Sequence, residues 1–158
     1  MTSKPFTTCL WFDNQGEEAA QYYTSIFKNS RIDGVHRYTE AGPGPEGAVM
    51  TVNFELNGQR FVALNGGPQY SFTPAISLVV ECADQAELDY YWERLGDGGH
   101  EVACGWLQDK YGLSWQVVPT AFLEMMKDPD PQKVARVTAA MLSMKKLDIA
   151  ELERAYAG

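Results

Sequence analysis

The sequence predicts an α+β fold in which two β-α-β-β-β modules are followed by C-terminal helices. Three observations support this: an internal repeat, short segments of alternating apolar and polar residues, and apolar residues at helical spacing near the C-terminus. In the repeat, Leu10 and the tyrosine pair ending at Tyr23 correspond to Leu78 and the tyrosine pair ending at Tyr91. Each copy runs from an apolar stretch through a polar turn into an amphipathic segment, so we expect the two copies to fold alike.

The first module is expected to span residues 5–66. Alternation predicts its strands, and the helical spacing of Ala19, Tyr23 and Phe27 predicts a helix after the first of them. The Asn-Gly pair that begins at Asn57 is the strongest short hairpin signal, so it should join the last two strands in antiparallel orientation. The expected strand, helix, strand, strand and strand lie at residues 5–12, 17–27, 31–39, 48–56 and 59–65.

The second module, residues 74–119, repeats this order with shorter strands. Asp84 is the expected N-cap of its helix. The Gly/Pro-rich loop of the first module, residues 41–47, has no counterpart here. The expected elements lie at residues 75–82, 84–95, 100–104, 106–109 and 113–119.

A helical tail is expected at residues 120–158. An Asp-Pro repeat that begins at Asp128 places a capping aspartate before a first-turn proline. An apolar seam follows, and a last helix begins after Asp148. We expect the seam to pack on the sheet of its own chain, with contact to a second copy as the alternative. The seam consists of Val134, Val137, Met141 and Met144.

Composition excludes several classes of protein. The chain has 158 residues, 45% of them hydrophobic, and a formal net charge of −8. These values are typical of one globular domain, residues 1–158, and a nucleic-acid-binding protein would need a clustered positive surface. No apolar run approaches the ~18 residues of a membrane span, and the N-terminus lacks the apolar stretch of a secretory signal. We therefore expect a cytoplasmic protein with no nucleic-acid or membrane partner.

Cysteine and histidine residues give no sign of catalysis. Cys9, Cys82 and Cys104 are widely spaced and form no CxxC pair, so neither a disulfide framework nor a zinc site is predicted. No base adjoins Cys9 in sequence to activate it as a nucleophile. His36 and His100 fall on the second strand of each module, where we expect structural or surface roles.

Several segments resemble the PhnB-like branch of the glyoxalase/bleomycin resistance/extradiol dioxygenase (vicinal oxygen chelate) superfamily. Members of this branch often carry the label 3-demethylubiquinone-9 3-methyltransferase. The resemblance covers essentially the whole chain, and the combination of motifs is specific. It is carried by the sequences CLWFD, VMTV, ALNGGP, CGWL, GLSWQVVP, DPDP and MKK at residues 9–13, 49–52, 63–68, 104–107, 112–119, 128–131 and 144–146.

The resemblance implies a sheet curled around a central cup. In the active relatives, a divalent metal is held there by His, Glu or Gln from the first and last strands of each module. Gln116 fills this position on the last strand of the second module. The other positions are held by Val62, by Thr7 or Cys9, and by Ala75 or Ser77. One amide and one thiol do not make a metal site, so we predict no metal and no other cofactor.

The methyltransferase label is not supported by the residues. Gly42–Gly47 reads G-x-G-x-x-G, but Pro43 and Pro45 lack the backbone N–H groups that cradle phosphates. A strand is predicted after this segment, where a nucleotide-binding turn would lead into a helix. The match is therefore interpreted as a loop.

The alternation of the strands predicts a ligand-binding face. The side chains expected to pack under the helices are Leu10, Phe12, Ile76, Leu78 and Val80. The opposite face should line the cup, where aromatic walls and a few uncharged polar groups suit a small, partly apolar ligand. The predicted ligand-binding residues are Cys9, Trp11, Thr51, Asn53, Ser77, Gln116 and, near the rim, Trp106. The alternative is that these side chains fill a closed barrel.

Three functions remain open from the sequence. The first is a metal-free protein that binds a small molecule, comparable to the drug-sequestering proteins of the superfamily. The second is a divalent-metal-dependent enzyme of lyase, isomerase or dioxygenase type, with Gln116 as one ligand. The third is a role in assembly, since PhnB-like proteins often look dimeric, and we expect a homodimer that could use the tail.

Overall fold

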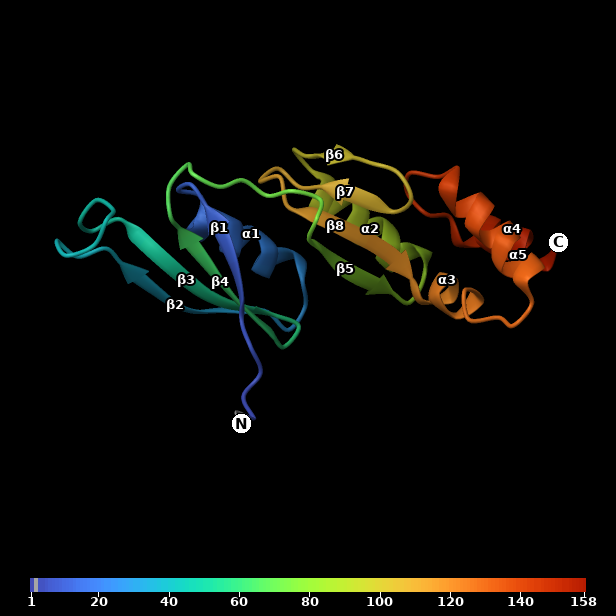
Figure 1. The fold of residues 1–158 in the computed structure, drawn as a ribbon, viewed down its shortest axis with the longest axis horizontal. Helices are drawn as coiled ribbons and strands as arrows, with labels where there is room; N and C mark the ends of the chain where they lie inside the picture. The colour runs from blue at the N-terminus through green and yellow to red at the C-terminus, as the bar shows by residue number, and fades with distance from the viewer. Residues whose placement is uncertain (2) are drawn as a thin grey trace. The chain divides into compact units, whose positions relative to one another are not determined.

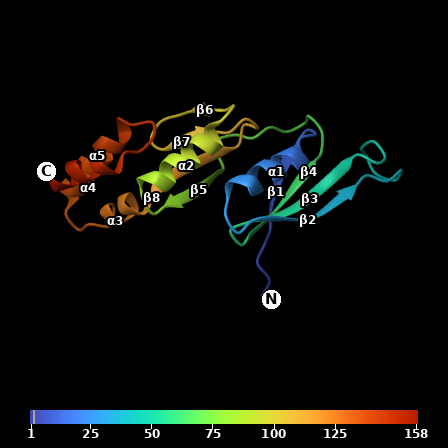
Figure 2. The same ribbon diagram turned by 180° about the vertical axis from the view of Figure 1, so that it is seen from behind.

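The computed structural model describes Met1 and residues 3–158, and its contacts divide the chain into two compact units. The first unit is Met1–Ser71 and the second is Phe72–Gly158. Figure 1 labels their strands and helices, and Figure 2 shows the same elements from behind. Each unit contains a four-stranded mixed sheet, so the predicted α+β class and the two β-α-β-β-β modules are confirmed. The assignment of residues 1–158 to a single domain stays a prediction.

The first unit has the element order predicted from the repeat. Its strands lie in the order β1-β4-β3-β2, with β1 parallel to β4 and the other neighbours antiparallel. Asn57 and Gly58 both have positive φ, 48° and 84°, as a tight hairpin between β3 and β4 requires. The elements are β1 (Thr8–Phe12), α1 (Gly16–Ile26), β2 (Arg31–Arg37), β3 (Val49–Leu56) and β4 (Gln59–Asn65).

Helix α1 covers one face of the first sheet. Its spacing of small and aromatic residues fits this role, since Ala19, Ala20 and Tyr23 are all completely buried. The ring of Tyr23 stacks on Phe54 with centroids 6.3 Å apart, and Phe54 stacks on Phe61 at 5.3 Å. The core of this unit is therefore an aromatic stack between the helix and the two central strands.

The second unit repeats the arrangement with the strand order β5-β8-β7-β6. Asp84 is the N-cap of α2, as predicted, and its Oδ1 accepts a hydrogen bond from the Glu87 N–H at 2.8 Å. Leu88 and Leu95 of this helix are completely buried. The elements are β5 (Ser77–Cys82), α2 (Gln85–Gly96), β6 (His100–Glu101), β7 (Trp106–Gln108) and β8 (Ser114–Pro119).

Two local expectations for the second unit were wrong. Ile76 was expected under the helix, but it precedes β5 and is 70% exposed, while Leu78 is half-buried. The strand expected at residues 100–104 is only His100–Glu101, because Cys104 adopts a positive φ of 59° and turns the chain. A left-handed residue cannot continue an extended strand, so the pairing stops before it.

The tail forms three helices, α3 (Thr120–Met125), α4 (Pro131–Leu142) and α5 (Ile149–Ala157). Pro131 begins α4, and the preceding Asp130 caps it by accepting a hydrogen bond from the Gln132 N–H at 2.9 Å. Val137 and Leu152 are completely buried between the helices. The apolar seam of α4 thus packs chiefly against α5 and not on the sheet, where it was expected. Among the described residues, no helix is long and apolar enough to cross a membrane.

A short segment between α4 and α5 fastens the tail to the second module. The backbone N–H groups of Cys104 and Gly105 donate to the carbonyls of Met144 and Lys145, each at 2.8 Å. Leu147 follows and is 1% exposed. The tail therefore extends the hydrogen bonding of the turn before β7.

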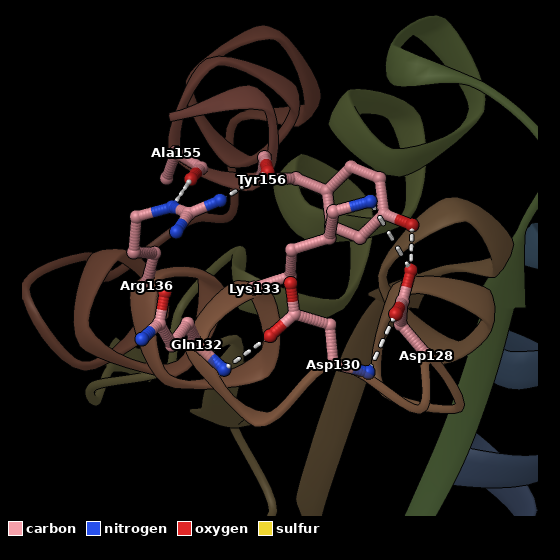
Figure 3. Close-up of polar contacts among 7 residues, drawn as sticks. All are labelled: Asp128, Asp130, Gln132, Lys133, Arg136, Ala155 and Tyr156. Atoms are coloured by element: carbon pink, nitrogen blue, oxygen red, sulfur yellow. Dashed lines mark hydrogen bonds and ion pairs between the residues drawn. The ribbon is translucent and has the colours of Figure 1, made fainter.

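Polar contacts join the end of α5 to the first half of α4 and to the residues just before it (Figure 3). The Arg136 guanidinium donates to the carbonyls of Ala155 and Tyr156, at 2.8 and 2.9 Å. The Tyr156 hydroxyl donates to the Asp128 carboxylate, and Lys133 Nζ lies 5.1 Å from the centre of the Tyr156 ring. These contacts hold the end of α5 beside the start of α4.

Candidate functional site

The four predicted ligand-binding residues of the first unit lie on the face of its sheet opposite α1. Along β1, Leu10 and Phe12 are buried under the helix, so the alternation turns Cys9 and Trp11 to the other side. Thr51 and Asn53 alternate in the same way with the buried residues of β3. We call this surface the open face of the first sheet.

Strand register arranges the open face of the first sheet in rows. Trp11 pairs with Leu64, which pairs with Thr51, and the row ends at His36 on β2. A second row contains Cys9, Val62, Asn53 and Gly34. On β1, β4 and β3 each row thus passes from an indole or thiol over an aliphatic residue to an uncharged polar side chain. His36, for which a structural or surface role was expected, also belongs to this face.

Trp11 is held firmly on the open face. Its indole N–H donates to the carbonyl of Gly67 at 2.9 Å. Gly66 approaches the ring so closely that a Cβ there would lie 2.3 Å from the nearest ring carbon. The Tyr70 ring stands at 82° to the indole with centroids 4.9 Å apart. The glycines of the predicted ALNGGP motif therefore position the indole.

The three predicted residues of the second unit also share one face. Gln116 lies opposite Trp106 in the register of β7 and β8, and its Nε2 donates to the Ser77 hydroxyl at 2.9 Å. Val79, on the same face, is 56% exposed. These residues lie on the side of the sheet opposite Trp115 and Val117, which are buried. We call this surface the open face of the second sheet.

Ser114 belongs to the same face and was missed. It lies two residues before Gln116 on β8 and opposite Ser77 on β5. The residue is 1% exposed, and its hydroxyl has no hydrogen-bond partner among the described residues. The period of two that selected Gln116 also selects Ser114, so the strand alternation alone could have identified it.

The structure thus brings the seven predicted residues together in two groups, one in each unit. Cys9, Trp11, Thr51 and Asn53 share the first sheet, and Ser77, Trp106 and Gln116 share the second.

The donors on these faces do not suit a metal ion. Gln116 is a weak ligand, and Val62, its counterpart in the first module, has no donor atom. Burial raises the pKa of the Cys9 thiol, which disfavours the thiolate that a metal or an electrophile needs. Among the described residues, no group of three or more His, Cys, Asp or Glu side chains is arranged to hold a metal.

A separate cleft of about 640 Å³ lies within the first unit, and none of the predicted residues lines it. It opens beside the start of α1 and the loop between β2 and β3. Three carboxylates, three side-chain amides and one tyrosine supply its polar groups. The lining residues are Asp13, Asn14, Glu17, Glu18, Tyr38, Pro43, Gly44, Pro45, Ala48, Val49, Asn65, Gly66, Gly67 and Gln69.

Asn65 and Tyr38 build the frame of this cleft. Asn65 Oδ1 accepts from the Gly16 N–H at 2.8 Å, and its Nδ2 donates to the Val49 carbonyl at 3.1 Å. The Tyr38 hydroxyl donates to the Asn65 carbonyl at 2.5 Å. Gly44 lies against the Tyr38 ring, where a Cβ would come within 2.4 Å. The G-x-G-x-x-G segment therefore forms a loop that lines one side of the cleft, and strand β3 follows it, as predicted.

Comparison with known proteins shows both family and fold. The family model described as 3-demethylubiquinone-9 3-methyltransferase matches residues 4–118. A PhnB protein from Bacillus cereus, whose description carries the same methyltransferase name, is 39% identical with a TM-score of 0.68. The match covers 74% of this chain and 100% of that one. None of the curated proteins matches the sequence.

More distant structures show the fold alone. Protein PA1353 from Pseudomonas aeruginosa is 16% identical with a TM-score of 0.62, over 74% of this chain and 98% of that chain. The fosfomycin resistance protein FosX from Mesorhizobium loti is 13% identical with a TM-score of 0.52, over 73% of this chain and 90% of that chain. Their agreement indicates that the paired β-α-β-β-β modules are common to all three.

Proposed function

We propose that this chain, which belongs to the PhnB-like family, binds a small organic molecule without a metal. The family is described as 3-demethylubiquinone-9 3-methyltransferase and is part of the glyoxalase/bleomycin resistance/extradiol dioxygenase superfamily. The observation that carries this proposal is the composition of the open face of the first sheet. A fixed indole, an aliphatic floor and two uncharged polar side chains, Thr51 and Asn53, lie side by side there. Such a surface suits a neutral, partly apolar ligand.

The polar groups of both open faces are proposed as ligand contacts. Thr51 and Asn53 are half-buried, and no hydrogen bond within the described residues engages their side chains. On the second sheet, Gln116 and Ser77 bond to each other, so a ligand would compete with that bond. Cys9 on the first sheet and Trp106 on the second complete the two proposed sets, each as a side chain that contacts the apolar part of a ligand bound on its own face.

The test is a screen of small neutral metabolites by NMR with the ¹⁵N-labelled full chain. A ligand should shift the amide signals of Thr51 and Asn53. The substitution Asn53→Leu should weaken its binding at least tenfold. Asn14→Leu is the matched control, because it replaces the same type of side chain with leucine in the cleft beside α1. If Asn14→Leu weakens binding and Asn53→Leu does not, the ligand site is the cleft, and the proposal for the open face is wrong.

A divalent-metal-dependent enzyme is the alternative function. It would require Gln116 and a further ligand outside the positions used by the active relatives. Elemental analysis of the purified protein, with thermal unfolding before and after EDTA treatment, tests this alternative. A stoichiometric divalent metal, and an unfolding temperature that falls on its removal, would overturn the metal-free proposal.

Methyl transfer is not proposed, despite the family description. A methyl-donor site places a glycine-rich turn between the first strand and the helix that follows it. Here those turns are Asp13–Gly16, whose single glycine is the first residue of α1, and Ala83–Asp84 before α2, so neither is glycine-rich. Calorimetry with S-adenosylmethionine should detect no binding, and a saturable heat of binding would restore methyl transfer as a candidate.

A homodimer is proposed as the state in which the protein works. Leu142 at the end of α4 is 62% exposed, and it is an apolar tail residue available to a second copy. Removing the tail would also remove buried Leu147 and the carbonyls of Met144 and Lys145 that bond to the turn before β7, so a surface substitution is the cleaner test. Sedimentation of Leu142→Glu should give a lower mass than the unmodified chain if the tail forms the interface, and an unchanged dimer mass would place the interface elsewhere.

A further inference from the structure

Trp11 and Tyr70 form a right-angled pair of rings in the first unit. Their planes meet at 82° and their centroids are 4.9 Å apart. A third aromatic ring placed against such a pair lies parallel to one ring and edge-on to the other. Both of these geometries are favourable for aromatic rings.

The indole half of the pair cannot easily move. The hydrogen bond from Trp11 to Gly67 fixes one edge of the ring, and the close approach of Gly66 fixes its position over the backbone. Its position is therefore set before any ligand arrives, which lowers the entropy lost on binding.

The Tyr70 half of the pair is left in solvent. Its side chain belongs to the segment after β4 and is 68% exposed, among the highest values for a large apolar residue of this chain. A ring of this size would normally gain free energy from burial. Tyr70 was not among the predicted ligand-binding residues, because it lies outside the alternating strands.

We infer that Trp11 and Tyr70 together receive a flat aromatic ring of the ligand, with Tyr70 as an additional specificity-determining residue. This inference rests on the proposed function, since it names the chemical class of the molecule that the open face binds. Thr51 lies in the same row of the sheet as Trp11, where it can contact a polar substituent of that ring.

The test uses two probes with the same amide group, benzamide and cyclohexanecarboxamide. Each is titrated into the ¹⁵N-labelled full chain, and binding is followed by the indole N–H signal of Trp11. Benzamide should bind at least fivefold more tightly than its saturated analogue. Tyr70→Leu should reduce this preference to less than twofold, whereas Tyr70→Phe, which keeps the ring, should preserve it.

The outcomes separate this inference from the proposed function. Equal affinity for the two probes, or an unchanged preference in Tyr70→Leu, would overturn the aromatic pair as a recognition element while binding by the open face stands. The same holds if neither probe binds but other molecules in the metabolite screen shift Thr51 and Asn53. If no molecule in that screen or this titration binds, both the function and the inference are wrong.

Discussion

The indole N–H of Trp115 donates to the buried carboxylate of Asp109 at 2.9 Å. The other carboxylate oxygen accepts from the backbone N–H groups of Tyr111 at 2.8 Å and Leu113 at 3.1 Å. Asp109 is 3% exposed, and it connects the turn between β7 and β8 to the core beneath α2. One side chain thus closes this turn and fixes an aromatic residue of the core.

Replacing Asp109 should therefore destabilise the second unit. Asp109→Asn keeps one acceptor but turns an amide N–H₂ group toward the Trp115 N–H, so a buried donor loses its partner at a cost of about 2 kcal/mol. Urea unfolding followed by circular dichroism measures this loss. Asp97→Asn, on the exposed end of α2, is the control and should stay within about 0.5 kcal/mol of the unmodified chain. Equal stabilities of the two variants would contradict the role given to Asp109.

Replacing Ser114, in contrast to Asp109, should stabilise the second unit. Its buried hydroxyl has no partner among the described residues, and an unsatisfied hydroxyl costs roughly 1–3 kcal/mol in a protein interior. Ser114→Ala should consequently raise the free energy of unfolding by about 1 kcal/mol. Ser77→Ala is the matched control, because it removes the partner of Gln116 and should not stabilise the protein. A loss of stability in Ser114→Ala would mean that the hydroxyl is bonded in solution.

Gly66→Ala should displace Trp11. The added Cβ would lie 2.3 Å from a ring carbon, well inside van der Waals contact, so either the indole or the loop must move. Of the four indole N–H signals expected in an NMR spectrum, that of Trp11 should shift most, since its bond to Gly67 is broken. Gly96→Ala is the control, because the nearest atom to its Cβ is 3.9 Å away. An unmoved Trp11 signal would show that the loop gives way first.

Most of the strands and helices could be predicted from the alternation of apolar and polar residues and from turn residues. The period of two in β3 and the Asn57-Gly58 turn were sufficient to predict a hairpin of the first sheet, and Asp84 was sufficient to predict the start of α2. These features are local, so a single sequence reveals them. Cys104 has a positive φ in a turn whose backbone N–H groups bond to Met144 and Lys145, far along the chain, and no local pattern predicted this turn.

Only those residues of the candidate site that lie on strands could be predicted, because the prediction used the alternation of side chains along a strand, here called strand parity. Parity placed Trp11 and Gln116 on the open faces, and it would also have placed Ser114 there. It says nothing of Tyr70, whose position depends on the loop after β4, nor of the cleft that Tyr38 and its loop enclose. Both features arise where irregular backbone folds onto a sheet, and period-based reasoning does not describe such segments.

The rate at which each cysteine reacts with a thiol reagent should depend on how deeply its thiol is buried. Cys82 is completely buried, and desolvation with the nearby carboxylates of Glu87, Asp84 and Glu81 raises its pKa to about 12. Labelling of the folded protein with a thiol-reactive disulfide reagent at pH 8 should therefore leave Cys82 unmodified. Cys9 is accessible and should react, though more slowly than a free thiol because its pKa is raised. Cys82→Ala should not change the number of thiols labelled before unfolding. A decrease in that number would contradict the assigned burial.

The Asp128–Tyr156 bond should make the stability of the tail depend on pH. The hydrogen bond from Tyr156 lowers the pKa of Asp128 below its usual 3.8, helped by the Asp130 N–H and by Lys133. Because the folded-state pKa is the lower one, this stabilisation is present above pH 3.8 and is lost as the pH falls through the folded value.

The same bond raises the pKa of Tyr156 above its usual 10.0, so its contribution is complete below pH 10.0 and is lost as the pH rises through the raised value. Tyr156→Phe should accordingly be less stable than the unmodified chain between these limits, and the difference should shrink at both extremes. Urea unfolding of both proteins from about pH 2 to about pH 12 measures it. A difference that stays constant across this range would show that the loss in Tyr156→Phe comes from packing, because a hydrogen bond to a titrating carboxylate cannot be independent of pH.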